Sequence, residues 1–113
     1  MVPTTATTYQ LFLGRKVDTP QFGPDEYVII SDEEFQEFVR FNIAPRFKSF
    51  SIVDGISYWK GESELVSIVT IVSEQYWDAI DINKIAKEYG HRFKQEAVFI
   101  NSLASFPNLV THV

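Results

Sequence analysis

Cysteine is absent from this chain of 113 residues, and histidine occurs only twice. A chain without cysteine forms no disulfide framework, no thiolate metal site and no cysteine nucleophile. The five glycines are scattered, so the sequence also lacks a glycine-rich phosphate loop and a nucleophile elbow. Zinc-ligand spacing is missing as well. We therefore expect no metal and no cofactor, and the corresponding reaction classes are disfavoured.

Basic residues are outnumbered, because 10 Lys and Arg stand against 15 Asp and Glu, and the formal net charge is −5. Nucleic-acid binding needs a basic stripe that neutralises phosphates, so we do not expect nucleic acid as a partner. No apolar run approaches the roughly twenty residues of a membrane-spanning helix. The start MVPTTATTYQ lacks the basic and apolar regions of an export signal. These absences predict a cytoplasmic protein without a membrane partner.

Apolar mass is what the chain has in quantity, since 45% of its residues are hydrophobic and 15% are aromatic. A domain of this length can bury roughly two thirds of its unfolded surface around one core. It can therefore fold without metals or disulfides. We predict a single domain over residues 1–113, with a flexible arm at 1–6 and a tail at 103–113.

Six secondary-structure segments follow from the apolar periodicity and the turn residues. We predict strands at 7–14, 50–59, 65–72 and 95–102, a helix from Ser31 to about Ala44, and a second helix that starts after Asp81 or as early as Asp78. The long connection at 15–30 is expected to be a lid or local flap. The order strand, helix, strand, strand, helix, strand predicts an α+β, ferredoxin-like sandwich with two helices on one face of a four-stranded antiparallel sheet.

The first helix has a predicted capping box at its start. The Ser31 hydroxyl can accept a hydrogen bond from the amide of Glu34, and the Glu34 carboxylate can reach back to the amide of Ser31. Pro45 disfavours helical geometry at the residue before it, so we expect the helix to end there.

The segment FSIVDGISYW contains Asp54-Gly55, a strong turn signal between two apolar arms. Its partner strand is long, and the KGES segment that follows is a competent hairpin loop. We therefore predict one continuous strand with a bulge at Gly55, which would change the direction of Tyr58 and Trp59. Asp54 would then lie inside a sheet, where a carboxylate needs a partner or an edge position.

Both faces of the predicted sheet are apolar, although two helices can cover only one of them. Either the tail and the 15–30 connection cover the second face, or a second subunit packs against it. The extent of the second face favours a homodimer of the kind called a dimeric α+β barrel.

Polar residues near the strand ends are the site candidates. In helix 82–93, Glu88-x-x-His91 has the spacing of a metal motif, but His91 falls on the face opposite the apolar stripe, so we assign it no metal. The remaining candidates are Arg15, Arg46, Asp54, Tyr58, Trp59, Gln95 and Glu96. They are either rim salt bridges and packing residues, or the lining of a cleft for a small anionic or aromatic molecule. A Glu in an apolar barrel could also have a raised pKa and act as a base.

Four segments together resemble a known family: LFLGR, SDEEFQEFV, APRFKSFSIVDGISYWKG and YGHRFKQEAV. They are similar to a bacterial family of uncharacterised proteins, domain of unknown function 3574, over most of residues 9–100. The resemblance implies a fold and a set of shared residues but no reaction. The shared residues are Gly14, Pro45, Arg46, Phe47, Asp54, Gly55, Trp59, Gly61, Tyr89, Phe93, Gln95 and Glu96.

Three functions remain open from the sequence. The first is a dimeric small-molecule-binding domain with an accessory or regulatory role. The second, by analogy of fold alone, is a cofactor-independent oxygenase or isomerase of the dimeric α+β barrel type, which needs a carboxylate or His in its cavity. The third is a purely structural association module.

Overall fold

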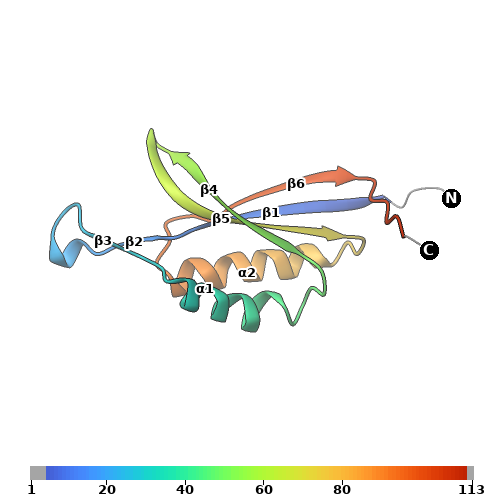
Figure 1. Ribbon diagram of the computed structural model, residues 1–113, viewed down its shortest axis with the longest axis horizontal. Coiled ribbons are helices and arrows are strands. Elements are labelled where there is room, and N and C mark those ends of the chain that lie inside the picture. Colours follow the sequence, from blue (N-terminus) through green and yellow to red (C-terminus); the bar gives the residue numbers. More distant parts are fainter. Residues whose placement is uncertain (1–4, 112–113) are drawn as a thin grey trace.

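A four-stranded antiparallel sheet forms the centre of the computed structural model, which describes residues 5–111. The strands lie in the order β4-β5-β1-β6, and their bounds are β1 (Ala6–Gly14), β4 (Ser51–Trp59), β5 (Glu62–Ser73) and β6 (Phe99–Ser105). Helices α1 (Asp32–Phe38) and α2 (Asp78–Arg92) both lie on one face of the sheet (Figure 1). A π-helical segment, η2 (Val39–Ile43), continues α1. The α+β class and its antiparallel sheet are as predicted.

The core lies between this sheet and the two helices. The helical stripes expected from the sequence are buried, and they meet Leu11 and Leu13 of β1 and Val69 and Ile71 of β5. Aromatic rings join the two helices, because the ring centroids of Phe38 and Tyr89 lie 5.1 Å apart in an edge-to-face arrangement. Such pairs add to the area term of apolar burial. Within the described residues, neither helix has the length and apolarity that a membrane-crossing helix needs.

Local signals place the helix starts. The Ser31 hydroxyl accepts from the Glu34 amide at 3.1 Å, so Ser31 is the N-cap that was predicted. The return contact differs, because the Glu34 carboxylate accepts from the Ser31 hydroxyl at 3.2 Å and not from its amide. A hydroxyl that accepts through its oxygen still has a proton to donate. Helix α2 begins at Asp78, the earlier of the two starts considered.

The hairpin β4–β5 contains no bulge. Its pairing runs unbroken from Ser51 opposite Thr70 to Trp59 opposite Glu62, with Gly55 opposite Val66. The continuous strand is therefore confirmed, and the bulge predicted at Gly55 is wrong.

The turn explains this regular ladder. Lys60 and Gly61 have φ values of 51° and 82°, the left-handed pair that a two-residue hairpin turn requires. A reversal of two residues matches the twist of both strands, so the ladder needs no extra residue. Tyr58 and Trp59 then point to opposite faces by simple alternation.

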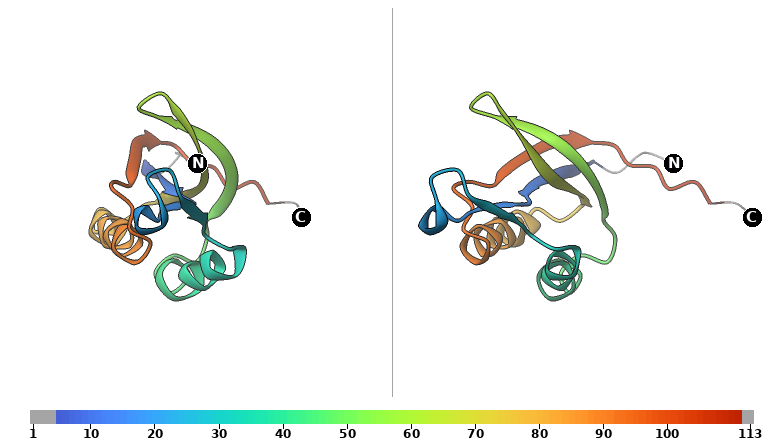
Figure 2. Two further views of the ribbon diagram at one scale, coloured as in Figure 1. Left: turned by 90° about the vertical axis from the view of Figure 1, so that its left-hand side faces the viewer. Right: turned by 60° about the vertical axis from the view of Figure 1, so that its left-hand side comes forward.

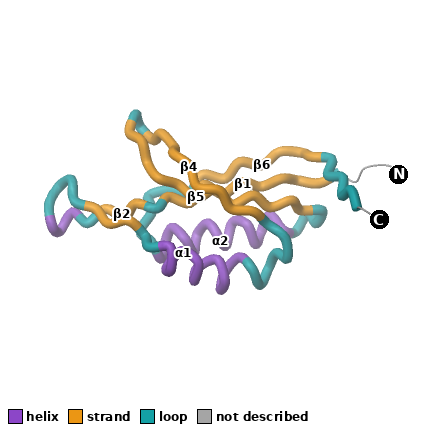
Figure 3. Tube along the Cα trace, viewed as in Figure 1, coloured by secondary structure: helices purple, strands orange, loops and turns teal. Residues whose placement is uncertain are grey.

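The connection at 15–30 forms a local flap, as expected. Strands β2 (Lys16–Asp18) and β3 (Tyr27–Ile29) pair with each other and carry a 3-10 turn at Pro20–Phe22 between them. The flap projects beyond one end of the sheet, while the C-terminal segment leaves at the other end (Figures 1 and 3).

The last strand starts four residues later than the predicted 95–102. Lys94 has a φ of 52°, and the amide of Gln95 donates to the Gly90 carbonyl at 2.9 Å, so these residues close the end of α2. Strand β6 begins where Phe99 pairs with Phe12 of β1. It extends to Ser105, so three residues of the predicted tail are strand, and β1 already includes Ala6 of the predicted arm. Residues 1–4 of the arm and 112–113 of the tail lie outside the described residues.

The sheet face opposite the helices is exposed within the single chain. Large apolar side chains on it are exposed by about half or more, and they are Val53, Val72, Phe99 and Leu103. The flap and the C-terminal segment extend from the ends of the sheet and do not cover this face (Figures 1 and 2). The exposed sheet face, defined by these four residues, is therefore open in one chain.

Candidate functional site

Arg15 directly follows β1, at the point where the chain leaves the sheet for the flap. Its amide donates to the Leu65 carbonyl at 3.1 Å, and its carbonyl accepts from the Ile30 amide at 2.7 Å. Arg15 is thereby held between strand β5 and the start of α1. Only 8% of the residue is exposed, which is unusual for an arginine and calls for partners.

The guanidinium of Arg15 has partners on both sides. Its Nη2 donates to the Ile30 carbonyl at 2.7 Å and to the Asp32 carboxylate at 3.0 Å. Its Nη1 donates to the Ser67 hydroxyl at 3.0 Å, and its Cζ atom lies 4.5 Å from the centroid of the Phe35 ring. The Nε atom is buried without a hydrogen-bond partner. One buried donor therefore remains unsatisfied, which is uncommon in native proteins.

Asp54 joins this group through Ser67. The two residues are directly opposite in the β4–β5 ladder, so their side chains share the face that looks toward the helices. The Ser67 hydroxyl donates to the Asp54 carboxylate at 2.7 Å. The result is a chain of contacts from Asp32 through Arg15 and Ser67 to Asp54, which we call the Arg15 network. Asp54 thus has both the partner and the edge-strand position that a carboxylate in a sheet needs.

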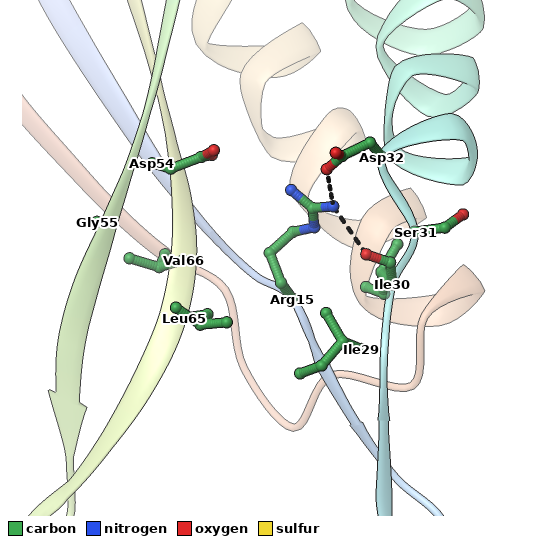
Figure 4. Close-up of a pocket in the computed structure, with 9 residues that line it drawn as sticks. All are labelled: Arg15, Ile29, Ile30, Ser31, Asp32, Asp54, Gly55, Leu65 and Val66. Carbon is green, nitrogen blue, oxygen red and sulfur yellow. Dashed lines mark hydrogen bonds and ion pairs between the residues drawn. The ribbon is translucent and has the colours of Figure 1, made fainter.

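Two adjacent cavities meet at the Arg15 network. The first has a volume of about 350 Å³ and is walled by apolar side chains, including Ile29, Ile30 and Leu65. The second, of about 320 Å³, adds Gln36 and Ile52 to its lining. Arg15, Asp32 and Asp54 line both. In Figure 4 the Asp54 carboxylate points across the first cavity toward Arg15 and Asp32. The volume lies at the lower end of the range typical of small-molecule pockets.

Tyr89 anchors the backbone next to Arg15. Its phenolic OH donates to the Gly14 carbonyl at 2.5 Å. Burial raises the pKa of Tyr89 above its usual range, while the positive charge of Arg15 acts in the opposite direction. The phenol therefore stays protonated and keeps donating at any ordinary pH.

Gln95 contacts the backbone just after β1, where the flap begins. Its side-chain amide donates to the Lys16 carbonyl at 2.9 Å and to the Phe93 carbonyl at 3.0 Å. It ties the start of the flap to the end of α2. A Cβ added at Gly14 would approach the Gln95 side-chain oxygen, so the glycine leaves room for this clamp.

The other predicted site residues lie outside the Arg15 network. Tyr58 and Trp59 are exposed at the tip of the β4–β5 hairpin. Glu96 is exposed and pairs with Lys60 of the same hairpin at 3.5 Å, which matches the rim alternative. Arg46 is exposed in the turn that follows η2. Asp32 begins α1, so the two residues lie at opposite ends of the continuous helix formed by α1 and η2. A single chain therefore gathers Arg15 and Asp54 but not the remaining candidates.

Two residues of the site were missed in the sequence analysis. Asp32 was considered only as part of a helix start, and Ser67 was not considered as a site residue. A signal for Ser67 was present, because it is a polar residue at a helix-facing position of an apolar strand. If the hairpin turns at Lys60-Gly61, residues at equal distances from the turn face each other, and Ser67 is then opposite Asp54.

In the part of the chain that the structure describes, no Asp, Glu or His side chain is buried that could serve as the base of the enzyme alternative. Asp54 and Glu96 are both exposed, whereas a carboxylate becomes a good base near neutral pH through burial. His91 is also exposed, as expected from its helical position. Among residues 5–111, no three His, Cys, Asp or Glu side chains are grouped so that they could hold a metal ion.

Comparison with known proteins agrees with the motifs. No curated protein matches the chain. The family described as "Protein of unknown function (DUF3574)" matches residues 8–106, a span that includes the flap, both helices and the whole Arg15 network. The resemblance inferred from the four sequence segments is confirmed, and the chain belongs to this family.

Proposed function

We propose that this protein is a cytoplasmic, homodimeric ferredoxin-like domain that binds a small molecule in the cavities at the Arg15 network, in an accessory or regulatory role. The strand order β4-β5-β1-β6 supports the ferredoxin-like arrangement. The first and third strands of this sheet along the chain, β1 and β5, are central, the second and fourth, β4 and β6, lie at the edges, and the two helices share one face.

The observation that carries the binding proposal is the position of Arg15. A buried guanidinium lines two cavities, lies between two carboxylates and retains an unpaired Nε. The Asp32 side chain that pairs with Arg15 is 96% exposed, and an ion pair with an exposed carboxylate contributes little to stability. A polar group beside an apolar wall is instead the usual composition of a ligand pocket.

The exposed sheet face supports the homodimer. Four large apolar side chains lie exposed on it in the single chain, and apolar surface of this kind marks interaction sites. Packing the same face of two copies against each other is the self-complementary arrangement of a two-fold dimer. Two such sheets with helices outside form the dimeric α+β barrel.

Native mass spectrometry of protein purified from its own host tests both parts, because it reports the oligomer mass and any retained ligand together. We expect a dimer that carries a non-protein mass. Leu65→Trp should fill the first cavity and abolish that mass, whereas Leu109→Trp, the same substitution on the exposed C-terminal segment, should retain it. Retention of the same mass by Leu65→Trp would contradict the pocket, and a dimer without ligand would favour the structural association module.

The dimer is tested separately by charge on the exposed sheet face. Phe99→Glu should give a folded monomer by light scattering at micromolar concentration, because a buried unpaired carboxylate is costly at an interface. Ile80→Glu is the matched control, since Ile80 on α2 and Phe99 are each 61% exposed in the single chain. A monomeric wild-type protein, or a Phe99→Glu protein that stays dimeric, would remove the sheet-face dimer.

A further inference from the structure

The charge of the pocket identifies the class of ligand. Three charged side chains line both cavities, and they are the cation Arg15 and the carboxylates Asp32 and Asp54. The lining therefore has a formal charge of −1. Arg15 already pairs with Asp32 at 3.0 Å, so its charge is compensated from that side. Asp54 accepts only from the neutral Ser67 hydroxyl.

Of the two carboxylates that line the pocket, Asp54 is the one without a counter-ion. Within residues 5–111 the ion pairs involve Asp32, Asp18, Glu96 and Glu37 on their acidic side, and Asp54 is in none of them. Its side chain points across the first cavity (Figure 4). An added cation at this position would restore charge balance, whereas an added anion would face two carboxylates.

The wall of the first cavity is apolar next to this charge. Ile29 of the flap and Leu65 of β5 contribute to it, and Leu65 is half exposed in the single chain. A ligand that covers these side chains gains from burying their surface. The pocket thus offers an apolar compartment that ends at a carboxylate.

The Nε of Arg15 is a buried donor that a cationic ligand does not satisfy, because an ammonium group has no acceptor. Its side chain is 9% exposed, and the atom has no acceptor. A bare divalent metal ion fits less well, because the fixed Arg15 charge lies between the two carboxylates.

We propose that the pocket binds a primary amine with a short apolar body, with its ammonium group against Asp54 and its body against Ile29 and Leu65. This rests on the proposed small-molecule function. It differs from the small anionic or aromatic molecule expected from the sequence, because Arg15 is already paired with Asp32.

The test uses three probes of equal chain length, which are hexylamine, hexanol and hexanoate, at pH 7. Binding is followed by amide chemical shifts in ¹H–¹⁵N spectra of the intact protein. We expect hexylamine to shift the amides of Asp54, Gly55 and Leu65 and to bind about ten-fold more tightly than the other two.

Asp54→Asn should weaken hexylamine about ten-fold and leave hexanol unchanged, because the substitution removes charge and keeps the shape. Asp25→Asn is the matched control on the exposed flap and should change neither. Equal or tighter binding of hexanoate or hexanol at the same amides would refute a primary amine as the ligand, although it would still support a binding pocket at this position. No shift at these amides with any probe would overturn the pocket itself, and full hexylamine affinity in Asp54→Asn would refute the role of Asp54.

Discussion

Tyr89→Phe isolates the hydrogen bond that anchors the backbone beside Arg15. The ring of Tyr89 packs edge-on against Phe38 at 5.1 Å and lies 4.8 Å from Phe93, and phenylalanine keeps both contacts. Only the OH that donates to the Gly14 carbonyl at 2.5 Å is lost. The substitution therefore measures one buried hydrogen bond in an otherwise unchanged core.

The expected cost is about 1–2 kcal/mol, because a typical hydrogen bond contributes about 1 kcal/mol net and an unpaired buried carbonyl adds to the loss. For a chain of 113 residues, an unfolding entropy of about 2.1 cal/mol/K per residue converts each kcal/mol into roughly 4 °C. We expect a fall in Tm of about 4–8 °C.

The pH dependence gives a sharper test. Burial raises the pKa of Tyr89 in the folded protein, whereas the unfolded chain loses the proton near pH 10. The contribution of this group is fully present below about pH 10 and is lost as the pH rises toward the folded pKa. Wild-type stability should therefore fall by about 1 kcal/mol between pH 10 and pH 11 through this group alone. The Phe variant lacks this loss.

Urea unfolding at pH 8, 10 and 11 measures the difference between the two proteins. The advantage of the wild type should be about 1–2 kcal/mol at pH 8 and should shrink by about 1.4 kcal/mol at pH 11. Tyr76→Phe is the control, because Tyr76 is 88% exposed, and it should match the wild type throughout. A Tyr89→Phe difference that stays constant with pH would refute the buried, protonated phenol.

Three further substitutions test single features by urea unfolding. Ser67→Ala should cost about 1–3 kcal/mol, because it leaves the Nη1 of Arg15 and the carboxylate of Asp54 each without a partner, and a neutral result would contradict the Arg15 network. Gly61→Ala should cost about 1 kcal/mol from backbone strain alone, since φ is 82° and no atom lies within 4 Å of the added Cβ; an unchanged midpoint would argue against the left-handed turn. Ser31→Ala should cost about 1 kcal/mol through the lost N-cap, and no loss would mean that the cap is not used in solution.

Features encoded by neighbouring residues were predictable from the sequence. The N-cap at Ser31, the two buried helical stripes and the reversal after Trp59 each depend on a few residues close in the chain. Their physical causes are local, since capping, helical periodicity and turn conformation act within one or two turns of backbone. The four-stranded antiparallel sheet, its two helices and the apolar second face followed from the same patterns.

Only the tertiary structure decided the features that join distant segments. The start of β6 depends on pairing with β1, more than eighty residues earlier, and the absence of a bulge depends on the full ladder between β4 and β5. The Arg15 network brings together side chains from the end of β1, the middle of the hairpin and the start of α1. No local pattern specifies such contacts, because they form only when the strands have paired and the start of α1 lies beside the sheet.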